Sequence, residues 1–306
     1  MKNKIFLTLT TILLVTSCKN SDIVLDEFTY HNDSIVIQDT LANVKKENAH
    51  VVFLYGQSNA DGVSHNEYLK KNDLDKYNEY SLGFDNVLIN YVNDGYNTSS
   101  NNGFIKCTLG NGAASSLFGP EIGIAEKMSK KYKDEKTFII KWTWGGTWLK
   151  DQWLDNNHGR GDLYNDSMDF SLKCLDYLID KGYNLSLDGI CWMQGENDST
   201  LKNSDIYYEN TKAFVTLLRH DFKQYQKIIK FVDAGINEEA GIWPHPVEIN
   251  KAKKKFANES IHNYYVDTAK LGLTSKNEPE DNVDYAHFDA TSMVKLGQAF
   301  GEFVSK

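Results

Sequence analysis

The amino-acid sequence predicts an α/β fold, a three-layer α/β/α sandwich around a central, mostly parallel, five-stranded sheet. Three observations lead to this prediction: apolar runs of strand length recur along the chain, segments with helical periodicity separate them, and no internal repeat or second domain boundary interrupts the series. Such an alternation is typical of a parallel sheet that helices cover on both faces. The five runs are residues 51–55, 137–142, 189–193, 228–232 and 263–266.

The N-terminus is predicted to lie outside this fold. Two lysines, Lys2 and Lys4, precede an apolar run over residues 5–15. The run is too short to cross a bilayer, which takes about 20 residues, and is typical of the core of a secretion signal. Residues 1–17 are therefore expected to be a signal peptide.

The end of this signal, "VTSC", resembles the lipobox of bacterial lipoproteins, in which the cysteine, here Cys18, is lipidated. On this prediction the protein would be exported and lipid-anchored to a bacterial membrane, periplasmic or at the cell surface, without spanning it. The alternative is an ordinary signal peptide with an incidental cysteine. Residues 18–48 are polar and are expected to be a tether, with a short added strand at "IVIQ", which leads into one domain over residues 49–306.

Helical periodicity defines three of the segments between the strands. The first has an apolar face that ends at Lys181 and Gly182, the basic last turn and glycine that stop a helix. The apolar positions are Met168, Leu172, Leu175, Leu178 and Ile179 in the first helix; Ile206, Phe214, Leu217 and Leu218 in the second; and Met293, Leu296, Phe300, Phe303 and Val304 in the last. Residues 93–119 form a long loop rich in Asn, Ser and Gly, of the kind that is often functional.

Composition excludes several classes of function. The formal charge is −9 and no basic tail or face is present, so nucleic acid is not an expected partner. The histidines are scattered without paired ligand spacing, and no metal or other cofactor is implied. Cys107, Cys174 and Cys191 form no C-x-x-C pair. Export would allow one disulfide among them with one thiol left over, and Cys191, inside an apolar run, is expected to be buried.

Polar and glycine-rich residues follow the predicted strands. They are "GQSN" from Gly56, "WGGT" from Trp144, "QGEND" from Gln194 and, after the fifth strand and a loop, "DNVDYAHFDATS" from Asp281. Because ligands bind outside the carboxyl ends of such strands, these groups are expected to converge on one edge of the sheet.

The same residues suggest a hydrolytic site. A serine hydroxyl such as that of Ser58 is a weak nucleophile until an imidazole removes its proton, and the imidazole needs an acid to orient it. Asp284 and His287 are three residues apart, which places both side chains on one face of a turn. A helix beginning near Asp289 would favour the neutral imidazole. Donors for the oxyanion would be the Ser58 N–H, a glycine N–H and the amide of Gln194.

The order of "GQSN", "FGPE" at 118–121, "WGGT", "WMQGEND" and "D-x-x-HF" resembles the SGNH-hydrolase superfamily, and within it the sialate O-acetylesterase-like and acetylxylan esterase branch, over residues 49–306. The resemblance implies that Ser58 is the nucleophile, His287 the base and Asp284 the acid. It also implies that Gly119 and Gln194 complete the oxyanion hole with Ser58. Glu196 stays open as an alternative acid or a brace of its loop, although the spacing favours Asp284.

The chain departs from the family pattern at Ala60-Asp61, where Met and a small residue are usual, and at Tyr285-Ala286. Asp61, beside the nucleophile, is expected to affect which substrates are accepted. Trp148, Trp153 and Trp243 are interpreted as core or rim residues, with stacking of one of them on a sugar ring as the alternative.

The expected function is that of a serine esterase that removes acetyl groups from a carbohydrate. The partner would be an acetylated polysaccharide or sialic acid. The rivals are an SGNH lipase or thioesterase on other small esters, and a catalytically silent carbohydrate-binding protein on this fold.

Overall fold

The central sheet has eight strands and is parallel except at one edge. The computed structural model describes residues 25–306, in which the strands lie in the order β10-β9-β8-β1-β7-β3-β4, with β5 also paired to β3. Six strands from β10 to β3 are parallel, and the short β4 and β5 run antiparallel to β3. The strands of this sheet are β1 (Glu47–Gly56), β3 (Val87–Asn93), β4 (Thr98–Ser99), β5 (Ile105–Lys106), β7 (Lys136–Thr143), β8 (Tyr183–Met193), β9 (Phe231–Ala234) and β10 (Asn263–Val266); β2 (Ser64–His65) and β6 (Leu117–Phe118) form a separate pair.

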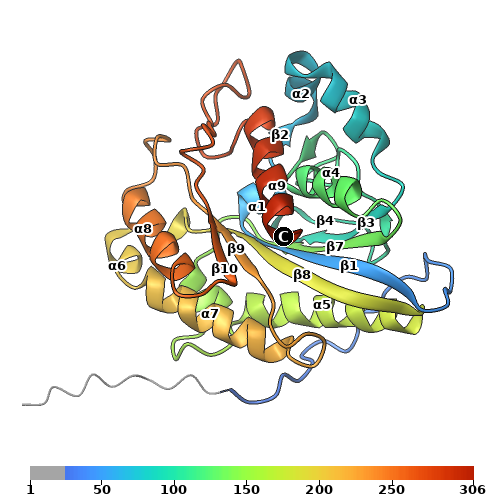
Figure 1. Cartoon of the computed structure of the whole chain (residues 1–306). Coiled ribbons are helices and arrows are strands. Elements are labelled where there is room, and N and C mark those ends of the chain that lie inside the picture. Colours follow the sequence, from blue (N-terminus) through green and yellow to red (C-terminus); the bar gives the residue numbers. More distant parts are fainter. Residues whose placement is uncertain (1–24) are drawn as a thin grey trace, which may run out of the picture.

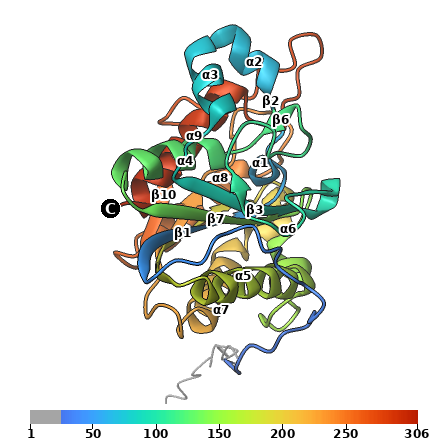
Figure 2. The same cartoon turned by 90° about the vertical axis from the view of Figure 1, so that its right-hand side faces the viewer.

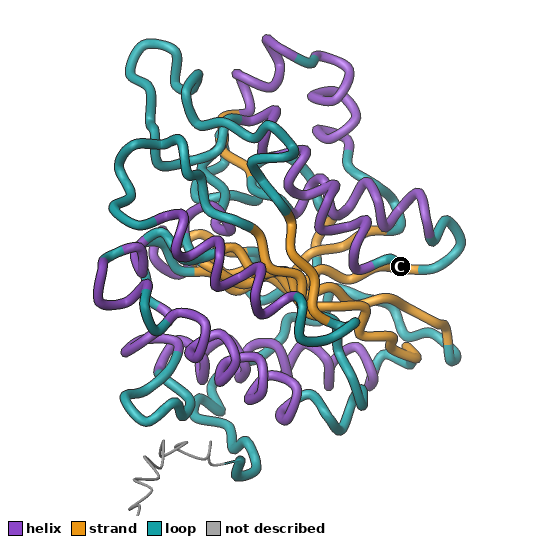
Figure 3. Tube along the Cα trace, turned by 60° about the vertical axis from the view of Figure 1, so that its left-hand side comes forward, coloured by secondary structure: helices purple, strands orange, loops and turns teal. Residues whose placement is uncertain are grey.

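Helices cover both faces of the sheet, which confirms the three-layer α/β/α prediction. Figures 1 and 2 show α5 and α7 on one face and α4 and α9 on the other, and Figure 3 shows the strands running through the middle. The α-helices are α1 (Ser58–Asp61), α2 (Asn66–Asn72), α3 (Leu74–Leu82), α4 (Glu121–Lys131), α5 (Asp162–Asp180), α6 (Leu201–Ser204), α7 (Tyr207–Asp221), α8 (Pro246–Ala257) and α9 (Ala290–Val304); three short helical turns are η1 (Asp94–Tyr96), η2 (Leu149–Trp153) and η3 (Asn197–Ser199).

The three helices predicted from periodicity are present. Helix α5 ends at Asp180, followed by Gly182 with a φ of 99°, as the basic turn and glycine predicted. The predicted faces of α7 and α9 are largely buried in the core, although Ile206 precedes α7 as its cap and Phe303 is only partly buried. In α5, Ile179 points outward and is exposed.

The strand prediction was incomplete in two places. The sheet contains β3, which makes six parallel strands where five were predicted, and β9, the fourth predicted strand, begins three residues and ends two residues later than predicted. Within β3, Asn90 is fully buried and accepts a hydrogen bond from the Ser100 hydroxyl, so a polar residue interrupts the apolar run. Ile228, predicted to start a strand, is 46% exposed, whereas Asp233 lies inside β9, buried and paired with Lys253.

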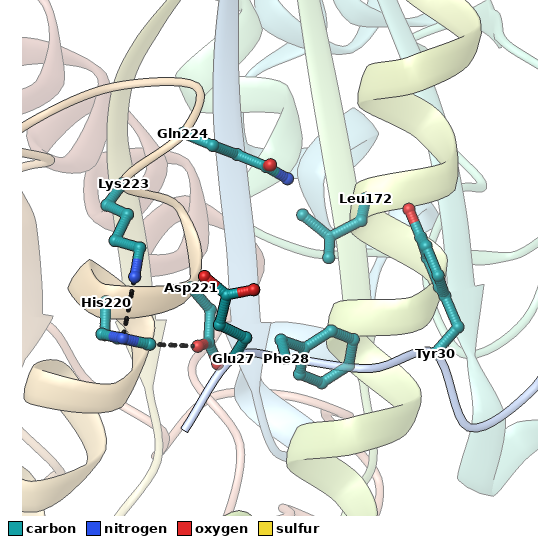
Figure 4. Close-up of a pocket in the computed structure, with 8 residues that line it drawn as sticks. All are labelled: Glu27, Phe28, Tyr30, Leu172, His220, Asp221, Lys223 and Gln224. Carbon is teal, nitrogen blue, oxygen red and sulfur yellow. Dashed lines mark hydrogen bonds and ion pairs between the residues drawn. The ribbon is translucent and has the colours of Figure 1, made fainter. Parts of the chain in front are cut away.

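The described part of the predicted tether packs on the domain. The backbone N–H groups of His31 and Asn32 donate to Asp169 of α5, and the Tyr30 hydroxyl donates to Asp176 of the same helix. The strand expected at residues 35–38 was wrong, because this stretch pairs with no strand. Figure 4 shows a pocket that the segment encloses with α5 and the end of α7; it is lined by Glu27, Phe28, Tyr30, Leu172, His220, Asp221, Lys223 and Gln224. None of these is a predicted site residue.

The cysteines and the N-terminal predictions complete the comparison. Cys107, Cys174 and Cys191 are each buried and unpaired, so the disulfide that export would allow is not formed in this structure. The signal peptide and Cys18 lie outside the described residues. Within residues 25–306, none of the helices has the length and apolar character needed to cross a membrane.

Candidate active site

The carboxyl ends of three adjacent strands bring the predicted motifs together. Gly56, the last residue of β1, pairs with Thr143 of β7 on one side and Met193 of β8 on the other. The segments that follow these three residues, including the one that carries Ser58, therefore leave the sheet side by side. Gly56 has a φ of 144°, and a Cβ there would lie 2.0 Å from the Met193 carbonyl oxygen, so the close approach of β1 to β8 requires glycine.

Ser58 is the first residue of the one-turn helix α1 and is partly exposed. Its hydroxyl makes no hydrogen bond within residues 25–306, and its backbone N–H also has no acceptor there. No hydrogen bond therefore joins Ser58 to His287 in this state. Hydrogen bonds between a nucleophile and its base often tighten only when substrate is bound, so this geometry is compatible with a catalytic pair.

His287 and Asp284 form a close pair on the loop between β10 and α9. The Nδ1 atom of His287 lies 2.5 Å from Oδ2 of Asp284, and the backbone N–H of Ala286 donates to the other carboxylate oxygen at 2.8 Å. The hydrogen bond with His287 holds the pKa of Asp284 below its usual value. Helix α9 begins at Ala290 with Asp289 as its cap, as the sequence predicted.

Asn59 attaches this loop to the turn that carries Ser58. Its side-chain oxygen accepts from the Phe288 N–H at 3.0 Å, and its Nδ2 donates to the Ala286 carbonyl at 3.3 Å. The two backbone groups flank His287 in the chain. The residue after the predicted nucleophile thus holds the backbone on both sides of the predicted base. The sequence showed Asn59 within "GQSN" but gave no sign of this role.

Glu196 contacts Asn59 and makes no hydrogen bond to His287. It is almost fully buried, one carboxylate oxygen accepts from Asn59 Nδ2 at 2.8 Å, and the other has no partner among the described residues. Burial raises the pKa of Glu196 above its usual value. In this arrangement Glu196 orients Asn59, and Asp284 is the carboxylate that touches the imidazole.

Gln194 has no hydrogen left for an oxyanion. Its Nε2 donates to the Thr147 carbonyl at 2.8 Å and to Asp198 Oδ2 at 2.6 Å, while its Oε1 accepts from the Tyr207 hydroxyl. A primary amide carries two hydrogens, and both are used. The fully buried side chain ties the loops after β7 and β8 together.

The backbone N–H of Gly119 is also already engaged in a hydrogen bond. It donates to Glu121 Oε1 at 2.7 Å, at the start of α4. In this structure neither Gln194 nor Gly119 has a free hydrogen, because each donates to a neighbouring loop or helix, and their place in the oxyanion hole stays a prediction.

Gly145 is the glycine that lies against Ser58. A Cβ built on Gly145 would be 3.4 Å from the Ser58 Cβ, and its N–H has no acceptor among the described residues. The signal was present in the sequence as the "WGGT" motif after the second predicted strand, although no role was assigned to its glycines.

Asp61 is a buried carboxyl group without a partner. It is 0% exposed, and neither oxygen has a hydrogen-bond partner within the described residues. A Cβ at Gly145 would lie 3.1 Å from its Oδ2, so the carboxyl sits behind the turn that contacts Ser58. Burial raises its pKa from 3.8 to about 6, against the opposing effects of the neighbouring Thr143 hydroxyl and of the charges of Lys141 and His287.

We expect the Asp61→Ala variant to be more stable than the wild type at neutral pH. The unfolded chain loses the Asp61 proton near pH 3.8 and the folded chain near pH 6, so the folded state carries a penalty that grows between these values. At about 1.4 kcal/mol per pKa unit, the penalty reaches about 3 kcal/mol at pH 7. Loss of packing offsets part of it. Urea unfolding should show a gain of about 1–3 kcal/mol at pH 7.5 that disappears below pH 4.

The control is Asp134→Ala, which removes an exposed carboxylate. It should leave the unfolding free energy within about 0.5 kcal/mol at both pH values. An Asp61→Ala protein that is less stable than the wild type at pH 7.5 would show that Asp61 has a partner in solution.

Comparisons with known proteins agree with this architecture. A family model described as "Carbohydrate esterase, sialic acid-specific acetylesterase" matches residues 48–306. A search of curated proteins gives no match.

Among solved structures, a protein from Arabidopsis thaliana aligns with a TM-score of 0.60 at 15% identity, over 83% of this chain and 97% of that chain. NanS aligns with a TM-score of 0.60 at 16% identity, over 85% and 98%. A protein titled a carbohydrate acetylesterase from Xanthomonas citri aligns with a TM-score of 0.51 at 14% identity, over 83% and 55%. At these identities the likenesses show a shared fold.

Proposed function

Since the chain belongs to the carbohydrate esterase family of sialic acid-specific acetylesterases, we propose that it removes acetyl groups from a carbohydrate through an acyl-enzyme formed on Ser58. The observation that carries the proposal is the pair of His287 and Asp284, 2.5 Å apart, on a loop that Asn59 fixes beside the nucleophile. Ser58, with no hydrogen bond of its own, is left available for attack.

The three side chains Ser58, His287 and Asp284 divide the steps of the reaction between them. The Ser58 oxygen attacks the acetyl carbonyl carbon while Nε2 of His287 takes the hydroxyl proton. Asp284 accepts from Nδ1–H, fixes the tautomer and stabilises the imidazolium. His287 then gives the proton to the departing sugar oxygen, and the C–O bond of the ester breaks. Water, deprotonated by the same imidazole, attacks the acetyl-serine, and acetate and the free Ser58 hydroxyl result.

The negative charge on the tetrahedral intermediate needs donors close to Ser58. The N–H groups of Ser58 and Gly145 have no acceptors within the described residues and lie on adjoining turns. We assign the oxyanion hole to these two backbone groups. Gln194 then acts as a brace that fixes the turn containing Gly145, through its bond to the Thr147 carbonyl.

A substrate panel tests the proposed function. The wild type is expected to release acetate from ethyl acetate and, with a higher kcat/KM, from O-acetylated sialic acid or acetylated xylan oligosaccharides. It should lose at least about tenfold in kcat/KM from acetyl to butyryl esters, because an added chain has to fit beside the Gly145 turn. Acetate release and acyl-chain profiles measure this.

Two outcomes would contradict the proposal. A preference for longer acyl chains would indicate a lipase or thioesterase. Binding of the sugars without release of acetate would indicate a silent carbohydrate-binding protein.

A further inference from the structure

We propose that Trp148 is a specificity-determining residue on which a sugar ring of the acetylated substrate stacks while the acetyl group lies at Ser58. The inference rests on the proposed function and names the part of the site that recognises the carbohydrate.

Trp148 is within substrate reach of Ser58. It follows Gly145 by three residues, and Gly145 lies against Ser58, with only 3.4 Å between its Cβ position and the Ser58 Cβ. Three residues span at most about 11 Å, since each adds no more than about 3.6 Å. A mono- or disaccharide can bridge that distance. Trp148 is therefore close enough to Ser58 to contact a ring attached to the reacting acetyl group, or the next ring.

The indole ring is fixed in place by its polar edge. Its Nε1–H donates to the Asn197 carbonyl at 3.0 Å, and the Trp148 backbone N–H donates to Gln152 Oε1 at 2.7 Å. The Asn197 side chain donates to the Gly146 carbonyl at 2.8 Å and accepts from Gln57, the residue before Ser58. The ring is thus connected to the nucleophile turn through one residue, and little side-chain freedom remains to be lost on binding.

The ring remains open to solvent despite this support. Trp148 is 41% exposed, whereas Trp153 is fully buried and packs edge-on against Trp142 and Trp192. The only polar atom of the indole is already bonded, so any part of the ring that is exposed is apolar. An apolar aromatic face suits the C–H face of a pyranose ring.

The turn that leads from Gly145 to Trp148 has free space at Gly146. Gly146 has a φ of 72°, and a Cβ built on it would have no atom within 4 Å. Gly146 therefore adds no side chain to this turn, and the side chain of Thr147, the next residue, is buried. The ring that does approach this turn is that of Tyr96, 3.3 Å from a Cβ built on Gly145.

The test compares substrates with and without a sugar ring. We expect Trp148→Ala to reduce kcat/KM for O-acetylated sialic acid or acetylated xylan oligosaccharides by about tenfold or more, mainly through KM. The value for ethyl acetate, which has no ring, should change less than about twofold. Trp148→Phe, which keeps an aromatic face, should recover most of the loss. The control is Tyr30→Ala, which removes a partly exposed aromatic ring 28 residues before Ser58 in the chain. It should behave as the wild type on both substrates.

Equal losses on ethyl acetate and on the sugars would mean that Trp148 only supports the loop, and no loss on the sugars would mean that no sugar ring stacks on it.

A second measurement separates this inference from the proposed function. Calorimetric binding of sialyllactose and xylotetraose to Ser58→Ala, with and without Trp148→Ala, needs no turnover. At least one of the two sugars should bind about tenfold more weakly without the ring, even if the wild type releases no acetate. Unchanged binding of both, or no binding of either, overturns the platform.

Discussion

Replacement of Ser58 by alanine is expected to lower kcat/KM for an acetyl ester by at least about 10⁴-fold. The variant keeps the backbone N–H groups of residues 58 and 145 but loses the oxygen on which the proposed acyl-enzyme would form. The Ser58 hydroxyl has no hydrogen bond within residues 25–306, so its removal leaves no partner unsatisfied. Stability should therefore change by less than about 0.5 kcal/mol. Acetate release, together with thermal unfolding of the same samples, measures both effects.

The matched control is Ser116→Ala, which removes an exposed serine hydroxyl at no catalytic position. It should retain full activity. Acid quenching of the wild type during turnover, followed by peptide mass spectrometry, should find the acetyl group on the peptide that contains Ser58. A Ser58→Ala enzyme with more than a tenth of wild-type activity, or an acetyl group found on another residue, would mean that a different nucleophile operates.

The fold could be predicted where apolar runs were uninterrupted. Residues 51–55 and 137–142 lie inside β1 and β7, which occupy the middle of the sheet and are buried on both faces. The strand β3 was missed because Asn90 sits within it, and β9 was placed too early because Asp233 reads as the end of a strand. Both polar groups are buried; Ser100, ten residues after Asn90, donates to it, and Lys253, twenty residues after Asp233, donates to one of its two oxygens. A periodicity argument has no access to such partners.

The residues of the site likewise include some that the sequence could predict and some that it could not. The contact between Asp284 and His287 depends on local spacing, and the sequence predicted it. The oxyanion donors depend on which N–H groups are already used, and this is decided by partners such as Asp198 for Gln194 and Glu121 for Gly119. Local spacing could not show that Gly145, more than eighty residues after Ser58, is the glycine beside it.

Asp284→Asn is expected to lower kcat by about 10³–10⁴-fold, whereas Glu196→Gln should lower it by no more than about tenfold. The Asp284 carboxylate is 2.5 Å from His287 Nδ1. An asparagine that offers N–H there would leave Nε2 protonated and unable to accept the Ser58 proton. Glu196 acts through Asn59, and a glutamine oxygen can still accept from Asn59 Nδ2. The measurement is kcat for ethyl acetate at pH 7.5, with exposed Asp281→Asn as the control for loss of a charge on the same loop.

The two carboxyl groups also differ in their response to pH. The bond with His287 lowers the pKa of Asp284, so this group stays ionised down to more acidic conditions than an ordinary aspartate. Burial raises the pKa of Glu196, so its charge penalises the folded state above its usual pKa, and Glu196→Gln should relieve that penalty at neutral pH. A variant that keeps its activity and gains thermal stability at pH 7.5 fits a positioning role for Glu196. If Glu196→Gln loses more activity than Asp284→Asn, the roles are reversed, and Glu196 is the acid that orients the imidazole.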